Sequence, residues 1–278
     1  MTSITLPPEF DLNGTIAVVT GGGTGIGRDT ALLLAERGAD VVVAGRRLEP
    51  LEEAAGEVRK LGRRALAVPT NVRKADECKA LIEATIKEFG KLDILINNAG
   101  GAHGHVGIHK MDLAKWDRDV QLNLNAALYC SQAAYPYLKA SRGCIVHISS
   151  QAGVGGTQGV AAYSAAKAGL QMLTKVMAAE FGPVGIRVNC VAPGMTATEA
   201  AVSGWDKRGF DAAAVAKDAF ALKRYGEMRE VSQGIVFFAS PAASYITGET
   251  MAIVGGSKIG GMINVEDDET MGTLLVKE

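Results

Sequence analysis

The sequence predicts an α/β protein in which a parallel sheet of about seven strands is doubly wound, with helices on both faces. Short apolar runs alternate along the chain with longer segments of helical periodicity. Runs such as Val41–Val43 and Ile94–Ile96 are apolar at every position, not at every second one. A strand needs this continuous apolar character when helices bury both of its faces. With no linker-like stretch and no internal repeat, we expect one domain over residues 1–256 and a tail at 257–278.

The candidate strands are short apolar runs, and the segments between them have the spacing of amphipathic helices. The strands are expected at Thr15–Thr20, Asp40–Ala44, Ala65–Pro69, Ile94–Asn97, Cys144–Ser149, Arg187–Val191 and Met251–Val254. The helices are expected at Gly25–Arg37, Leu48–Leu61, Lys74–Phe89, Trp116–Lys139, Ala161–Phe181 and Met228–Ala239. This alternation implies right-handed crossovers between parallel strands. The segment at about 194–221 breaks the rhythm and is expected to form a loop over the substrate.

Charge and composition argue against several classes of partner. Thirty acidic and 29 basic residues give a formal net charge of −1, which argues against nucleic acid or an anionic membrane surface as the main partner. The four cysteines are far apart and form no CxxC pair, so we expect reduced thiols. Neither a signal-peptide core nor an apolar run of membrane-spanning length is found, so we expect a cytoplasmic protein.

A glycine-rich turn, Thr20–Gly27, follows the first candidate strand and opens the first candidate helix. Glycines let the backbone turn sharply and leave no Cβ to obstruct a pyrophosphate. The start of the following helix offers free N–H groups and a positive dipole end. Because strand, turn and helix occur together, this motif predicts a dinucleotide site. No GxxxxGK[ST] pattern is present, so a P-loop nucleotidase is not supported.

The end of the second candidate strand indicates which nicotinamide cofactor binds. An acid at this position would accept hydrogen bonds from a ribose 2′-hydroxyl, whereas an arginine pairs with a 2′-phosphate. The chain has no acid there and instead has Arg46 and Arg47. Guanidinium groups bind phosphate in a bidentate manner, so we expect NADP(H) to be preferred over NAD(H). The alternative is that both arginines simply begin a solvated helix.

Tyr163 and Lys167 are four residues apart in a segment with helical spacing. Residues with this separation share a helix face, so both side chains are expected in one pocket. A free tyrosine has a pKa of about 10, and a nearby cation favours the phenolate. We therefore expect Lys167 to lower the pKa of Tyr163 and make the phenol a proton shuttle.

Taken together, these motifs resemble the classical short-chain dehydrogenase/reductase family. The glycine turn has that family's TGxxxGxG spacing, and Asn97–Gly100 is similar to its NNAG element. The resemblance covers roughly residues 12–256 and is nearest in pattern to β-ketoacyl-carrier-protein reductases. It implies a Rossmann-type fold and an oxidoreductase that interconverts a small-molecule ketone and a secondary alcohol with a nicotinamide cofactor.

The resemblance also implies a catalytic set of Asn123, Ser150, Tyr163 and Lys167. Ser150 lies thirteen residues before Tyr163 and would polarise the substrate oxygen; Ser149 is the rival candidate. Asn123 would join a proton relay through a water, with Asn125 as its nearest competitor. The expected cofactor contacts are Gly21, Thr24, Gly25, Ile26, Gly27, Arg46, Arg47, Asn71, Val72, Asn98, Ala99, Gly100, Tyr163, Lys167, Pro193, Gly194, Thr196 and Thr198.

Some readings compete with this one. A 2,4-dienoyl-CoA reductase and a non-catalytic dinucleotide sensor are alternatives, but proteins of these kinds typically lack part of the Tyr163/Lys167 pair.

His103, His105 and His109 cluster in a glycine-rich loop without a cysteine or acid to complete a ligand set, so we expect no metal. Relatives form dimers or tetramers, which implies a homo-oligomer here. The chain departs from them after the last strand, where no acid precedes Gly255 and Gly256.

Overall fold

The computed structural model describes residues 7–102, 106–207 and 209–256. Within these residues, seven strands form one sheet in the order β3-β2-β1-β4-β5-β6-β7, and all neighbouring pairs are parallel. The strands are β1 (Ile16–Thr20), β2 (Asp40–Gly45), β3 (Ala65–Pro69), β4 (Ile94–Asn97), β5 (Cys144–Ile148), β6 (Arg187–Pro193) and β7 (Thr250–Ile253). This confirms the predicted doubly wound, Rossmann-type fold. The strand order changes direction between β1 and β4, where such folds bind their ligands.

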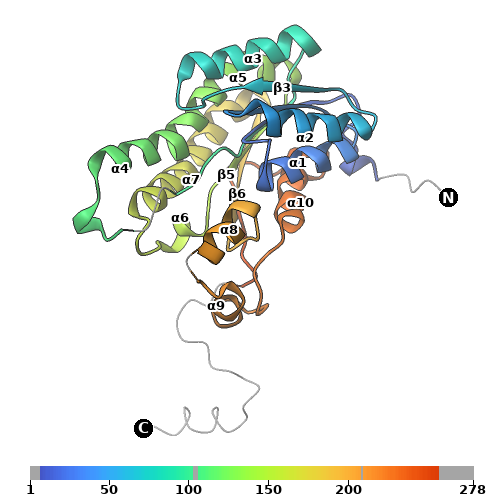
Figure 1. Cartoon of the computed structure of the whole chain (residues 1–278). Helices are drawn as coiled ribbons and strands as arrows, with labels where there is room; N and C mark the ends of the chain where they lie inside the picture. The colour runs from blue at the N-terminus through green and yellow to red at the C-terminus, as the bar shows by residue number, and fades with distance from the viewer. Residues whose placement is uncertain (1–6, 103–105, 208, 257–278) are drawn as a thin grey trace, which may run out of the picture.

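Helices cover both faces of the sheet (Figure 1). One face carries α1 (Gly25–Glu36), α2 (Leu48–Lys60) and α10 (Met228–Ala239). The other carries α3 (Ala75–Phe89), α5 (Ala126–Ser141) and α7 (Ala161–Phe181). Side chains within a strand divide between the two cores: Val41 and Val43 pack on the first face and Val42 on the second, all fully buried. The continuous apolar runs therefore follow from burial on both sides.

The predicted helix at Trp116–Lys139 is interrupted in the structure. It consists of α4 (Leu113–Val120), one π-helical turn at Gln121–Asn125, and α5. Such wide turns are rare and often occur at functional sites. The turn holds Asn123, so the interruption falls on a predicted catalytic residue.

Three further α-helices remain in the described part of the chain, and one of them, at Glu199–Lys207, contributes residues to the cleft described below. The short α6 (Ala152–Gly155) follows β5 and was not predicted. The segment at 194–221, expected to be a loop, contains α8 (Glu199–Lys207) and α9 (Ala212–Ala219). The tail at 257–278 lies outside the described residues, as do His103 and His105.

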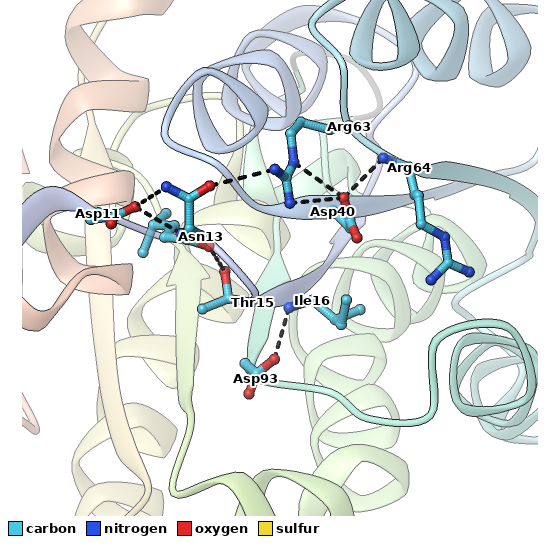
Figure 2. A network of polar contacts seen from close by, with 9 residues as sticks. Asp11, Asn13, Thr15, Ile16, Asp40, Arg63, Arg64 and Asp93 are labelled. Atoms are coloured by element: carbon cyan, nitrogen blue, oxygen red, sulfur yellow. Dashed lines mark hydrogen bonds and ion pairs between the residues drawn. The ribbon is translucent and has the colours of Figure 1, made fainter. Parts of the chain in front are cut away.

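Polar side chains tie together the amino ends of the strands, at the edge opposite the cleft (Figure 2). The carboxylate of Asp40, at the start of β2, accepts hydrogen bonds from Arg63 Nε at 3.2 Å and from the Arg64 amide at 2.9 Å. Asp93 Oδ2 accepts one from the Ile16 amide at 2.8 Å. These contacts join the amino ends of β1 and β2 to the turns before β4 and β3. They stabilise the end of the sheet that lies opposite the cleft.

In the part of the chain that the structure describes, none of the helices combines the length and the apolar character that crossing a bilayer requires.

Candidate active site

A cleft of about 1060 Å³ lies along the carboxyl ends of the strands. All eighteen residues predicted to contact the cofactor line this cleft, and so does Ser150. Arg46, Arg47 and Asn71 line it where β2 and β3 end. The predicted catalytic tyrosine, lysine and serine line it near the end of β5. Its volume is at the upper end of the range for ligand pockets, which suits an extended dinucleotide with a substrate beside it.

The glycine turn is held by the loop that follows β4. Asn98 Nδ2 donates to the Thr20 carbonyl at 2.9 Å, and Thr20 Oγ1 accepts from the amides of Asn98 and Ala99 at 3.0 and 3.1 Å. A Cβ on Gly27 would overlap the Gly21 carbonyl oxygen, so the turn requires glycine there. The first N–H groups of α1 have no partner within the helix and can hold an anion. These residues therefore fit the pyrophosphate of a dinucleotide.

The two serines after β5 have different surroundings. Ser149 is buried; its Oγ donates to the Lys167 carbonyl at 2.9 Å and accepts from Gln171 Nε2 at 2.9 Å. Ser150 is half-buried at the cleft wall, where its Oγ accepts from the Ala152 amide at 3.1 Å. The Ser150 side chain also hydrogen-bonds the Tyr163 phenol, whereas both functions of the Ser149 hydroxyl are used by Lys167 and Gln171.

Lys167 is buried one helical turn after Tyr163. Its Nζ donates to the Ile148 carbonyl at 2.6 Å and lies 5.7 Å from the centre of the Tyr163 ring. Burial lowers the pKa of Lys167 to about 8 because the charged ammonium loses its water.

The expectation that Lys167 lowers the pKa of Tyr163 is wrong for this arrangement. Burial raises the pKa of the phenol, and the Ser150 side chain opposes that rise. The ammonium lies over the ring, 5.7 Å from its centre, and is bonded to the Ile148 carbonyl, so burial decides the direction of the shift. The phenol is therefore protonated at neutral pH.

Asn123 lies behind the cleft. Its Oδ1 accepts from the Gly101 amide and its Nδ2 donates to the Gly101 carbonyl, both at 2.9 Å. The same Nδ2 donates to the Asp119 carbonyl at 2.9 Å. Asn123 and Lys167 both line a cavity of about 10 Å³, close to the space that one water needs. It is thus Asn123, and not Asn125, that the π-helical turn directs toward the site.

Three residues near the site were missed by sequence reasoning. Arg73 lines the same cleft as Arg46 and Arg47, two residues after the predicted contact Asn71. His147, fully buried in β5, has its pKa lowered to about 3 by burial and then by the charge of Lys167, so it is neutral. Glu199, at the start of α8, accepts a hydrogen bond from the Gly25 amide at 3.1 Å. Only the position of Arg73 could have been found from its spacing.

The chain matches the short chain dehydrogenase family over residues 15–209. It is 40% identical to a cis-4-hydroxycyclohexanecarboxylate dehydrogenase from Sinomonas cyclohexanicum, over 87% of this chain and 95% of that one. It is 39% identical to a 3-oxoacyl-[acyl-carrier-protein] reductase from Synechocystis, over 88% and 97% of the two chains.

Among solved structures, L-sorbose reductase from Gluconobacter frateurii, complexed with NADPH and L-sorbose, superposes with a TM-score of 0.85 at 31% identity. The match covers 90% of this chain and 98% of that one. Fold, glycine turn and sequence relationship agree, and this chain belongs to the short-chain dehydrogenase/reductase family of NAD(P)-dependent oxidoreductases that act on alcohol and ketone groups.

Proposed function

We propose that this protein interconverts a small-molecule ketone and a secondary alcohol, with NADP(H) preferred over NAD(H) and Tyr163 as the general acid and base. The observation that carries the proposal is the position of Tyr163 and Ser150 in the wall of one cleft, with Lys167 fixed one turn away. The nicotinamide supplies the hydride to carbon, or accepts it in the reverse direction.

Ser150 and Tyr163 handle the substrate oxygen. The Ser150 hydroxyl donates a hydrogen bond to the carbonyl oxygen and stabilises the charge that grows on it. Tyr163 transfers its proton to that oxygen as the C–O bond becomes single, which completes the alcohol. Because burial raises the pKa of Tyr163, the phenol holds the proton that ketone reduction consumes.

Lys167 and Asn123 return a proton to Tyr163. A pKa of about 8 lets Lys167 exchange protons near neutral pH. The cavity that Lys167 shares with Asn123 is close to the size of one water, which supports a relay from Tyr163 through Lys167 and a water toward the Asn123 turn.

The other residues of the cleft are proposed to hold the cofactor. Arg46 and Arg47 are exposed beside the cleft where β2 ends, and no acid stands at that tip. They would pair with a 2′-phosphate, assisted by Arg73. Asn71 and Val72 would contact the adenine, and Pro193, Gly194, Thr196 and Thr198 the nicotinamide amide, as in relatives.

We further propose a cytoplasmic homo-oligomer, dimer or tetramer. On α7, Met172 and Val176 lie one turn apart and are 59% and 45% exposed, an apolar pair suited to contact with a second copy. Light scattering after size exclusion measures the oligomeric state.

The intact Tyr163 and Lys167 disfavour two alternative functions, a dienoyl-CoA reductase and a non-catalytic sensor.

A panel of ketones and secondary alcohols, followed by NADPH and NADH absorbance, tests the proposed reaction. We expect turnover with members of the ketone or alcohol panel and higher kcat/KM with the phosphorylated cofactor. Reduction of a dienoyl thioester without any ketone turnover would favour the enoyl alternative. Binding of NADPH with no turnover on the whole panel would favour the sensor.

A further inference from the structure

The carboxylate of Glu199 is bonded to the glycine turn. Its Oε2 accepts a hydrogen bond from the Gly25 amide at 3.1 Å, although the two residues are 174 positions apart in the sequence. Gly25 is the first residue of α1, so this amide is one of the free N–H groups at the positive end of the helix. Gly25 and Glu199 both line the cleft.

The local structure around Glu199 holds the carboxylate near this amide. Thr198 lies directly before α8; its Oγ1 accepts from the Ala201 amide at 3.1 Å, and its carbonyl accepts from the Val202 amide at 2.9 Å. A Cβ on Gly25 would lie 3.6 Å from Thr198 Cβ and 3.8 Å from Glu199 Oε2, so the start of α8 packs directly on the turn. The neighbouring Arg28 forms its short ion pair, at 2.6 Å, with Glu57 instead.

We infer that Glu199 is an internal competitor for the cofactor pyrophosphate and thereby limits cofactor affinity. This inference rests on the dinucleotide binding that the proposed function requires. A carboxylate and a pyrophosphate are both anions, and a single N–H group cannot donate a full hydrogen bond to each. The pyrophosphate therefore has to displace Glu199 from Gly25 or bind beside its negative charge.

The consequence concerns exchange of the cofactor. When the dinucleotide leaves, the carboxylate restores the hydrogen bond of the Gly25 amide and so competes with the return of the pyrophosphate. Cofactor release limits turnover in many enzymes, and a competing side chain at the pyrophosphate would speed it. Glu199 thus acts on affinity and release, not on the proton chemistry at Tyr163.

Calorimetric titration of the full-length protein with NADPH, ADP and adenosine 2′-monophosphate tests this. A carboxylate at a helix N-terminus is worth about 0.3–1 kcal/mol, which converts to a two- to fivefold change in Kd. In E199A we expect ADP and NADPH to bind about two- to fivefold more tightly, and in E199Q by a smaller factor. Adenosine 2′-monophosphate has no pyrophosphate, and its Kd should stay the same.

The matched control is D218N, which removes one negative charge from exposed Asp218 of α9 in the same segment. It should leave the Kd of each ligand unchanged. Equal tightening of all three ligands in E199A, or unchanged or weaker ADP binding in both Glu199 variants with native melting temperatures, would overturn the inference. Failure of the unaltered protein to bind either NADPH or NADH would instead refute the proposed function.

Discussion

The ammonium of Lys167 lies 2.6 Å from the carbonyl oxygen of Ile148 and donates a hydrogen bond to it. Ile148 is the last residue of β5, directly before the two serines, and Lys167 lies in α7. This contact helps to hold the strand end beside Ser150, the proposed substrate contact, against the helix that carries Tyr163. The same contact places a buried cation at the base of the site.

This burial predicts a pH-dependent contribution of Lys167 to stability. Its pKa is about 8 in the folded protein and 10.5 as a free group, so between these values the unfolded chain binds more protons. The free energy of unfolding of the unaltered protein, minus that of K167M, should rise from pH 8 to pH 10 and be nearly flat below pH 7. Urea melts of both proteins across this range measure the difference. A difference that falls with increasing pH would contradict the assigned environment.

Ser149 and Ser150 should respond differently to substitution by alanine. Removing one donor to a developing oxyanion typically lowers kcat about 10²- to 10³-fold, and we expect a loss of this size in S150A. S149A removes the bonds to the Lys167 carbonyl and to Gln171, so its main effect should be a lower melting temperature. Steady-state kinetics and thermal melts of the two variants make the comparison. A larger loss of kcat in S149A would make Ser149 the substrate contact.

Arg46 and Arg47 should determine cofactor choice. Charge-assisted hydrogen bonds contribute about 1.5–3 kcal/mol, so the double variant R46A/R47A should bind NADPH at least tenfold more weakly. Its affinity for NADH, measured by fluorescence titration, serves as the internal control and should change little. Equal weakening of both cofactors would show that the arginines do not read the 2′-phosphate.

Substitution of Gly100 tests the proposed proton relay, because Gly100 lies against Asn123 and Lys167. A Cβ there would lie 2.8 Å from Asn123 Oδ1 and 3.0 Å from Lys167 Nζ, so alanine has to push one of them aside. We expect G100A to lower kcat about tenfold or more while the protein remains folded, since small misplacements of catalytic groups are costly. G56A in α2 is the matched control, because its Cβ would meet nothing within 4 Å. Unchanged kcat in G100A would argue against the relay.

Much of the fold could be predicted because local pattern and global burial agree. Runs such as Val41–Val43 are apolar throughout because successive side chains enter two different cores. The π-helical turn at Gln121–Asn125 could not be predicted, since helical periodicity continues across it and Asn123 bonds Gly101, which is 22 residues away in the sequence.

The candidate site, like the fold, could be predicted only in part. Its residues could be chosen by motif and spacing, and the predicted cofactor contacts do line one cleft. The predicted direction of the Tyr163 pKa shift was wrong. The shift depends on burial, which the four-residue separation of Tyr163 and Lys167 does not reveal. The Glu199–Gly25 contact joins positions 174 residues apart and has no signature in the local sequence.

The most direct test of the proposed chemistry is the turnover of Y163F with the best substrate from the panel, measured beside its affinity for NADPH. Removing only the phenolic oxygen should lower kcat by about 10²- to 10⁴-fold, the range for a general acid and base, and leave the Kd for NADPH nearly unchanged. Turnover within a few-fold of the unaltered enzyme would show that Tyr163 is not the proton donor.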